Sequence, residues 1–328
     1  MQNTQTPQSV PEHLVKANPK LWQVANEINW EELDPNLSIV VGSSFVDPAD
    51  PFGLMGNPFA VAVGTNVAGL DANERLEIAK RTNTPETVFI NSCEHNETNN
   101  YAINLTVYTP SGSEMGACAH GFLGAIQTLL QTGKISANST LSIVTTLNTS
   151  ANATIDELGN IALEFQAAAP QSLVVDGETL TNIYSISLGD YKNCGVLSVG
   201  SPKLTIEIAP EVFDSLQRNL GKIDYEALLK FQDSGKVNGI HIFCRNLQTM
   251  LPEKCIQNNA YSGPDNLADR ATGVSNAAQI SADENIKVGQ SLKVTQYSFS
   301  GPSAILALTK LENGKIMVGG ATALFNVE

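Results

Sequence analysis

The 328-residue chain has few positive charges and no long apolar run, and each shortage excludes a class of partner. It carries 19 Lys and Arg against 33 Asp and Glu, a net charge of −14 at pH 7, which argues against nucleic acid or an anionic membrane as partner. No window approaches about 18 apolar residues, so no membrane-spanning helix is expected. With 42% hydrophobic residues the chain can still bury a sizeable core, and its length suits two domains.

Cofactor and metal signatures are also missing. The five cysteines include no C-x-x-C pair, and no secretory signal precedes them, so we expect reduced thiols in a cytoplasmic protein. No Cys/His spacing matches a zinc site, and Walker, G-x-G-x-x-G and G-x-S-x-G patterns are absent. The sequence therefore predicts no metal and no cofactor, and leaves acid–base chemistry by side chains.

The chain divides into three segments. Residues 1–36 are predicted to be a helical extension, 37–167 a first domain and 168–320 a second, with 321–328 completing the first as a strand. Each half contains many short strands, 183–188 among them, and a single buried helix. This pattern favours an α+β fold in which a sheet wraps around a central helix, and disfavours a doubly wound sheet.

One stretch, 114–130, combines reactive side chains with a helix start. Cys118 and His120 follow small residues, and an apolar segment from Phe122 to Leu130 should form a buried helix beginning near Gly121. The backbone N–H groups of such a first turn attract anions, so Gly121 and Phe122 are candidate substrate-binding residues. The alternative is a tight turn entering a core helix, with a buried cysteine.

A second stretch of the same kind lies about 150 residues downstream. Asp269 precedes a glycine and a short apolar helix, predicted to begin near Gly273. The candidate substrate-binding residues here are Arg270, Thr272, Gly273 and Val274. If both helix N-termini faced one cleft, they would bind a small carboxylate, and Arg270 would favour an additional anionic group.

Glu86 is the first candidate for acid–base work. It stands at the entrance of the apolar strand Thr87–Ile90. In a cleft of low dielectric constant its pKa would rise, and it could exchange protons near neutral pH. The alternative is a surface residue at a strand start.

Six segments in order resemble the phenazine-biosynthesis PhzF family. They are GNPFAVAV at 56–63, ETVF at 86–89, TP at 109–110 with EMGACAH at 114–120, VGSP at 199–202, DRATGVS at 269–275 and GPS at 301–303. Each match alone is weak, but the ordered series is fairly specific.

The resemblance implies a diaminopimelate-epimerase-like fold of two similar domains with the site between them. It implies a cofactor-free isomerase that moves a proton on a small carboxylate, usually as a homodimer. The proton shuttle maps to Glu86, and the residues that bind or polarise the substrate map to His120 and Asp269. The glycine-rich loops around Gly121 and Gly273 would hold a carboxylate through backbone amides.

The chain departs from the family pattern at Ala119, Gly121, Arg270 and Gly301. In racemases of the same fold two cysteines flank the substrate carbon, and Cys118 falls at the first position. Arg270 occupies the second and cannot act as a base, so a two-thiol racemase is disfavoured. Two alternatives stay open, an epimerase that uses Cys118 with Glu86 and a non-catalytic binding protein.

Overall fold

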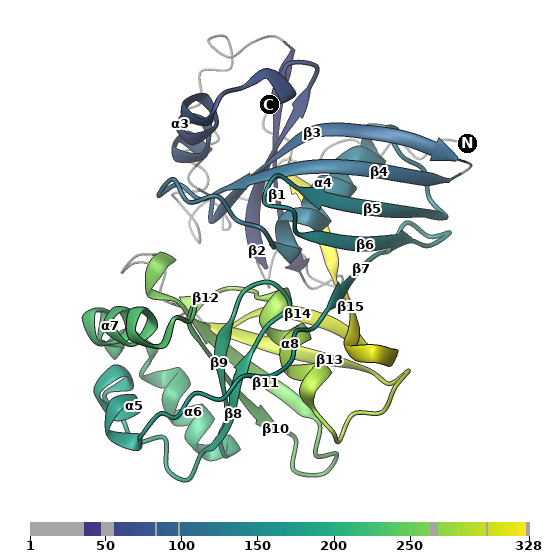
Figure 1. The fold of residues 1–328 in the computed structure, drawn as a ribbon. Helices are drawn as coiled ribbons and strands as arrows, with labels where there is room; N and C mark the ends of the chain where they lie inside the picture. Colours follow the sequence, from purple (N-terminus) through teal and green to yellow (C-terminus); the bar gives the residue numbers. More distant parts are fainter. Residues whose placement is uncertain are drawn as a thin grey trace. The chain divides into compact units, whose positions relative to one another are not determined.

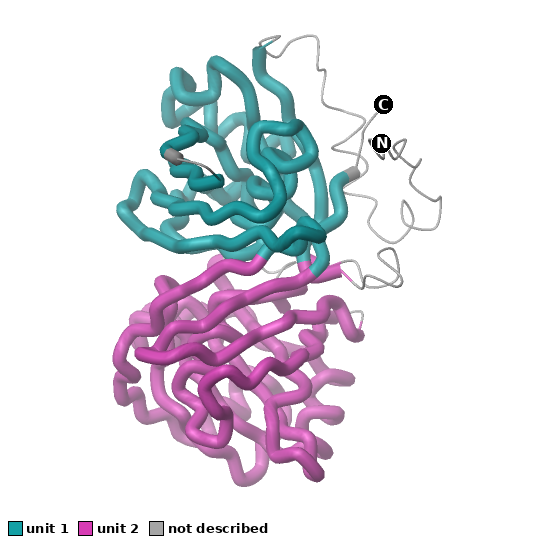
Figure 2. The backbone as a smooth tube through the Cα atoms, turned by 90° about the vertical axis from the view of Figure 1, so that its right-hand side faces the viewer, with its two compact units in different colours: residues 1–44, 58–161, 321–328 teal, residues 45–57, 162–320 magenta. Residues whose placement is uncertain are grey.

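The computed structural model describes residues 36–46, 56–82, 84–97, 99–262, 268–299 and 301–325. Apart from Asn36, the predicted N-terminal extension lies outside the described residues. The chain forms two compact units, coloured separately in Figure 2. Unit 1 comprises residues 1–44, 58–161 and 321–328, and unit 2 comprises 45–57 and 162–320.

Unit 1 is a sheet with two α-helices among its described residues (Figure 1). The strands are β1 (Leu37–Val46), β2 (Asn57–Gly64), β3 (Glu86–Glu97), β4 (Asn100–Tyr108), β5 (Ser139–Thr145), β6 (Ser150–Ile155) and β16 (Ala321–Phe325), and the helices are α3 (Ala72–Thr82) and α4 (Ala119–Gln131). The strand order is β16-β1-β2-β3-β4-β5-β6. The pairs β2–β3 and β4–β5 are parallel, whereas β3–β4 and β5–β6 are antiparallel.

Helix α4 is the buried centre of unit 1, as its composition predicted. Every residue from Ala119 to Ile126 is buried. The helix can lie against β2 because residue 124 is glycine, and a Cβ there would come within 2.4 Å of the Phe59 ring. A helix that is apolar on all sides is stable only when surrounded, and here the sheet surrounds it.

Unit 2 repeats the plan with more covering helices. The strands are β7 (Ile161–Gln166), β8 (Lys192–Leu197), β9 (Lys203–Glu207), β10 (Ile240–Arg245), β11 (Pro252–Asn258), β12 (Ala268–Asp269), β13 (Ser291–Ser298), β14 (Gly301–Lys310) and β15 (Lys315–Gly319), and the α-helices are α5 (Gly177–Tyr184), α6 (Pro210–Arg218), α7 (Tyr225–Gly235) and α8 (Gly273–Ala282). Short 3-10 turns occupy 67–69 in unit 1, and 220–222, 260–262 and 312–314 in unit 2. The strand order is β7-β15-β14-β13-β11-β10-β9-β8, with β12 beside β11.

Two different layers cover the sheet of unit 2. Leu204, Ile206, Ile240 and Ile242 pack with α5, α6 and α7 in one apolar cluster. Side chains alternate along a strand, so the intervening residues face the other way, toward α8. Arg245 shows this orientation, since its Nη1 lies 2.8 Å from the Asp283 carboxylate that follows α8.

The strand predicted at 183–188 is wrong, because part of that segment belongs to helix α5. The Asp176 side chain caps the helix by accepting a hydrogen bond of 2.7 Å from the Thr179 N–H. The helix ends at Ser185, which has a left-handed conformation (φ 57°). The cap overrides the strand-like alternation of apolar residues in this segment.

Gly56 and Asn57 group with unit 2, although Pro58 and the rest of β2 belong to unit 1. The Gly56 N–H donates to the Ser303 carbonyl at 2.8 Å, and Asn57 Nδ2 donates to the Ala271 carbonyl at 2.9 Å. These bonds join residues far apart in the sequence, which local pattern does not reveal.

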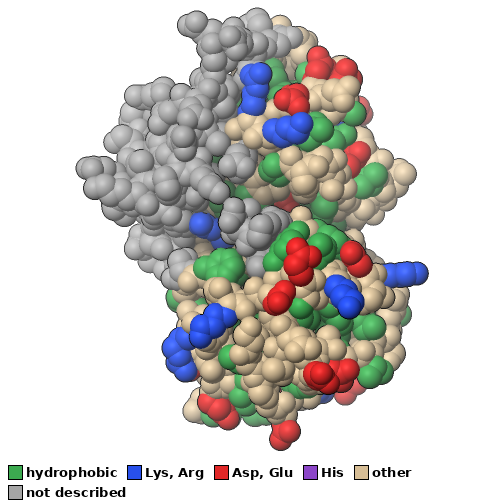
Figure 3. Space-filling model, turned by 90° about the vertical axis from the view of Figure 1, so that its left-hand side faces the viewer, with side chains coloured by type: hydrophobic (Ala, Val, Ile, Leu, Met, Phe, Trp, Pro, Cys, Tyr) green, Lys and Arg blue, Asp and Glu red, His purple; other side chains and the backbone are tan. Residues whose placement is uncertain are grey.

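No helix among the described residues is long and apolar enough to cross a membrane. On the face drawn in Figure 3, acidic and basic side chains of the described residues are interspersed. The excess negative charge is therefore not gathered in one place on that face.

Candidate active site

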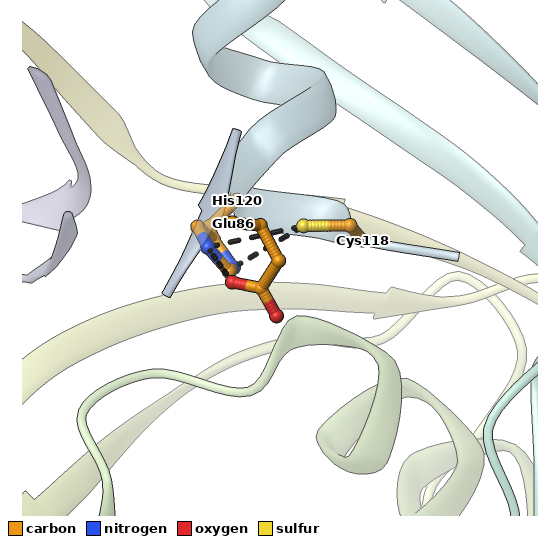
Figure 4. A group of neighbouring side chains, drawn as sticks. All are labelled: Glu86, Cys118 and His120. Atoms are coloured by element: carbon orange, nitrogen blue, oxygen red, sulfur yellow. Dashed lines mark hydrogen bonds and ion pairs between the residues drawn. The ribbon is translucent and has the colours of Figure 1, made fainter. Parts of the chain in front are cut away.

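Glu86, Cys118 and His120, three of the predicted catalytic residues, meet in unit 1 (Figure 4). Glu86 Oε2 lies 2.8 Å from His120 Nε2. The Cys118 sulfur lies 3.7 Å from Nδ1 and 3.8 Å from Nε2 of the same ring. One donor atom from each residue falls within 4.8 Å of the others.

Glu86 reaches this position because it begins β3. It stands opposite Phe59 in the parallel pairing with β2, and its carbonyl accepts a hydrogen bond of 2.9 Å from Thr84 Oγ1. Its side chain is only 17% exposed. The alternative of a surface carboxylate at a strand start is therefore excluded.

Cys118 and His120 are placed by the start of α4. Cys118 is extended (φ −147°, ψ 90°), and the helix begins at Ala119. The predicted start near Gly121 is thus two residues late, because Ala119, a strong helix former, extends the first turn. The His120 carbonyl accepts a hydrogen bond of 2.9 Å from Ser44 Oγ, which fixes that turn to β1.

Burial and charge act in opposite directions on the pKa of His120. Burial disfavours the imidazolium, but Cys118 and the Glu86 carboxylate outweigh it and raise the pKa well above 6.5. Burial raises the pKa of the Cys118 thiol, the charge of His120 opposes that change, and the charge of Glu86 adds to it. The imidazole of His120 therefore keeps its proton to a higher pH than a histidine in water does.

The Cys118 sulfur lies within hydrogen-bonding distance of both nitrogens of the His120 ring. Its distances to the two ring nitrogens are nearly equal, at 3.7 and 3.8 Å. Which nitrogen donates and which accepts depends on the tautomer of the imidazole. Glu86 Oε2 lies closer to the ring, 2.8 Å from Nε2, where it forms an ion pair with the protonated imidazole.

Asp269, the fourth predicted catalytic residue, lies in unit 2 at the turn before α8. Its Oδ1 accepts from Asn57 Nδ2 at 3.0 Å and from the Ala271 N–H at 3.3 Å. Its Oδ2 accepts a short hydrogen bond from the Thr272 hydroxyl. Both carboxylate oxygens thus accept hydrogen bonds, which makes Asp269 an organiser of the turn before α8.

Gln296 of β13, which sequence reasoning missed, holds the same loop from the other side. Its Nε2 donates to the Asp269 carbonyl and its Oε1 accepts from the Thr272 N–H, both at 2.8 Å. Asn276 Nδ2 also contacts Oε1 at 3.3 Å. The sequence signal for Gln296 was a polar residue at a position of β13 where the alternating pattern places buried side chains.

The predicted substrate-binding residues of unit 2 lie at this turn. Arg270 is half-buried, and burial lowers its pKa while the Asp269 charge opposes that change. Thr272 and Val274 are buried, and α8 begins at Gly273 as predicted. Because the first α-helical bond runs from Asn276 N–H to the Thr272 carbonyl, the N–H groups of residues 273–275 are the first-turn donors. A cleft shared by both helix N-termini stays a prediction.

Comparison with solved structures shows the same fold. A PhzF-family phenazine biosynthesis protein of Bacillus anthracis matches with a TM-score of 0.65 and 18% identity, covering 88% of this chain and 97% of that one. A predicted epimerase of Pseudomonas aeruginosa matches with a TM-score of 0.65 and 17% identity over 88% and 96%. A hydroxyproline epimerase of Agrobacterium vitis with bound trans-4-hydroxy-L-proline matches with a TM-score of 0.55 and 11% identity over 88% and 91%.

No curated protein matches the chain significantly. Residues 49–244 match the family described as phenazine biosynthesis-like protein, PhzC-PhzF. The matched region includes all three members of the Glu86 cluster, and the fold is the mixed α/β, epimerase-like fold of the neighbouring structures. The chain belongs to the PhzC-PhzF, phenazine biosynthesis-like family.

Proposed function

We propose that the chain is a cofactor-independent isomerase that moves a proton on a small carboxylate-bearing metabolite, with Glu86 as the proton shuttle. The observation that carries the proposal is the 2.8 Å contact between Glu86 Oε2 and His120 Nε2, two largely buried side chains. A carboxylate can remove a proton from a carbon next to an electron-withdrawing group and return it to a neighbouring carbon.

His120 supports this chemistry through its charge. The imidazole, whose pKa is raised, lies 2.8 Å from the Glu86 carboxylate that we propose as the base. The same imidazolium can donate a hydrogen bond to negative charge that develops on the substrate. Asp269 is proposed to act indirectly, by shaping the turn before α8 for substrate binding.

Epimerisation by Glu86 and Cys118 as a pair is the second candidate. Such a reaction needs its acid and base on opposite faces of one carbon, and two reactive contacts of about 3–3.5 Å place them roughly 6–7 Å apart. The donor atoms here lie within 4.8 Å of one another, too close for a carbon to fit between them. The geometry therefore favours a single-base shuttle working on one face of the substrate.

The test is deuterium exchange in heavy water. The chain is incubated with a panel of small 2-amino, 2-hydroxy and unsaturated carboxylates, and incorporation is followed by proton NMR and mass spectrometry. We expect wild type to label at least one compound and Glu86→Gln to be slower by roughly 10²–10⁴-fold. Equal exchange in Glu86→Gln would remove the glutamate from its role, and ligand binding without any exchange would favour the non-catalytic alternative.

A further inference from the structure

The donor atoms of Glu86, Cys118 and His120 are of three kinds that one metal ion can bind together. A carboxylate oxygen, a thiolate sulfur and an imidazole nitrogen are all ligands of Zn²⁺. In this structure the three atoms lie within 4.8 Å of one another, in the compact arrangement that a shared ion requires. From this grouping we propose that Glu86, Cys118 and His120 form a three-ligand site for a single Zn²⁺ ion.

The backbone holds the donors in this arrangement. Cys118 and His120 lie at the start of α4, whose first turn is tied to β1 by Ser44 Oγ at 2.9 Å. Glu86 is held at the start of β3 by its pairing with β2. Cys118 and His120 are buried and Glu86 nearly so, and their removal from bulk water strengthens their attraction for a cation.

Binding requires small movements of two side chains. The His120 ring turns so that one nitrogen points at the ion, and Glu86 Oε2 gives up its 2.8 Å contact with Nε2 to bind the ion instead. The protons of the thiol and the imidazolium pass to the buffer, because only the deprotonated forms are ligands. Three protein donors leave one tetrahedral position for water or a substrate carboxylate.

The ion would coordinate the same side chains that the proposed reaction uses. Zn²⁺ bound to the Glu86 carboxylate would prevent it from accepting a proton, so the ion would inhibit proton transfer reversibly. Inhibition rests on the proposed function, whereas metal binding does not, so metal binding and deuterium exchange are measured separately.

The experiment is a titration of the full-length, reduced chain with Co²⁺, which takes the place of Zn²⁺ and is visible spectroscopically. We expect one equivalent to give a sulfur-to-cobalt charge-transfer band in the near ultraviolet and d–d bands of a four-coordinate ion, both removed by one equivalent of Zn²⁺. Cys118→Ser should lose the charge-transfer band, and Glu86→Gln should weaken binding at least about 10-fold.

The matched control is Cys93→Ser, since Cys93 is another free thiol in the same unit, on β3. It should bind Co²⁺ as wild type does. Circular dichroism confirms that each variant is folded, and Glu86→Gln serves alone if Cys118→Ser fails to fold. Absence of the charge-transfer band in wild type, or its persistence in Cys118→Ser, overturns the site. If the band appears and exchange continues under saturating Zn²⁺, the site stands and the inhibition is refuted.

Discussion

Gly121 lies directly against the sulfur of Cys118. A Cβ at position 121 would stand 2.8 Å from Sγ and 2.7 Å from Val88 Cγ2, both closer than real Cβ contacts. The glycine that departs from the family pattern is therefore what allows the thiol to lie beside His120 on the first turn of α4.

Gly121→Ala should accordingly disturb the cluster as well as the fold. We expect the free energy of unfolding to fall by about 1–3 kcal/mol, because a methyl group is forced into a packed site. Chemical denaturation followed by circular dichroism measures this. Gly69→Ala is the control, since a Cβ there meets nothing within 4 Å, and a comparable loss in that variant would refute the packing argument.

Cys118→Ala separates the two mechanisms proposed for the cluster. A Glu86 shuttle needs no thiol, so deuterium exchange should stay within about 10-fold of wild type, while Glu86→Gln loses roughly 10²–10⁴-fold. Cys93→Ala serves as the control for thiol removal in general. Abolished exchange in Cys118→Ala alone would support the epimerase alternative.

Gln296→Leu should destabilise unit 2 through the Asp269 loop. The change leaves the Asp269 carbonyl and the Thr272 N–H without the partner that now holds each at 2.8 Å. A buried unsatisfied polar group costs about 1–3 kcal/mol, so we expect at least this loss in the free energy of unfolding. Gln248→Leu, at an exposed position of the same unit, should change it by less than about 0.5 kcal/mol. Equal effects would mean that Gln296 does not hold the loop.

His241 should make the protein sensitive to acid. It is fully buried on β10, and burial, aided by the charge of Lys203, lowers its pKa from 6.5 to about 3. Neither ring nitrogen has a hydrogen-bond partner among the described residues. The folded chain therefore keeps this histidine neutral at pH values where the unfolded chain protonates it.

The protein should lose stability as the pH falls, because the unfolded chain binds a proton that the folded chain does not. Because the folded pKa is depressed, the stability is fully present above pH 6.5 and is lost as the pH falls toward 3, by about 1.4 kcal/mol per pH unit. In denaturation experiments at pH 7, 6 and 5, His241→Gln should lose less stability on acidification than wild type. His95→Gln, at an exposed position, should follow wild type. Parallel curves for wild type and His241→Gln would contradict the prediction.

The sequence by itself determined the features that depend on local composition. The apolar run after His120 could only be a buried helix, and α4 is buried as predicted. Small residues before Gly273 marked the start of α8. The ordered motifs identified the family, because they survive as short segments even where overall identity to the solved structures is 11–19%.

Local pattern failed where a cap or a distant partner decided the outcome. Asp176 caps a helix where the alternation of apolar residues predicted a strand. Helix α4 begins at Ala119, two residues before the predicted start. The hydrogen bond from Asn57 to Asp269 Oδ1 joins residues more than two hundred positions apart, and the catalytic role of Asp269 stays a prediction.

Only the tertiary structure brought Glu86 to His120 and Cys118, which lie about thirty residues apart from it in the sequence. Glu86, the first residue of β3, is not part of any Cys/His spacing in the sequence. The pairing of β2 with β3 and the burial of α4 place the three side chains together. Strand register and helix packing are properties of the whole core, because each depends on the apolar area that many separate segments bury at once.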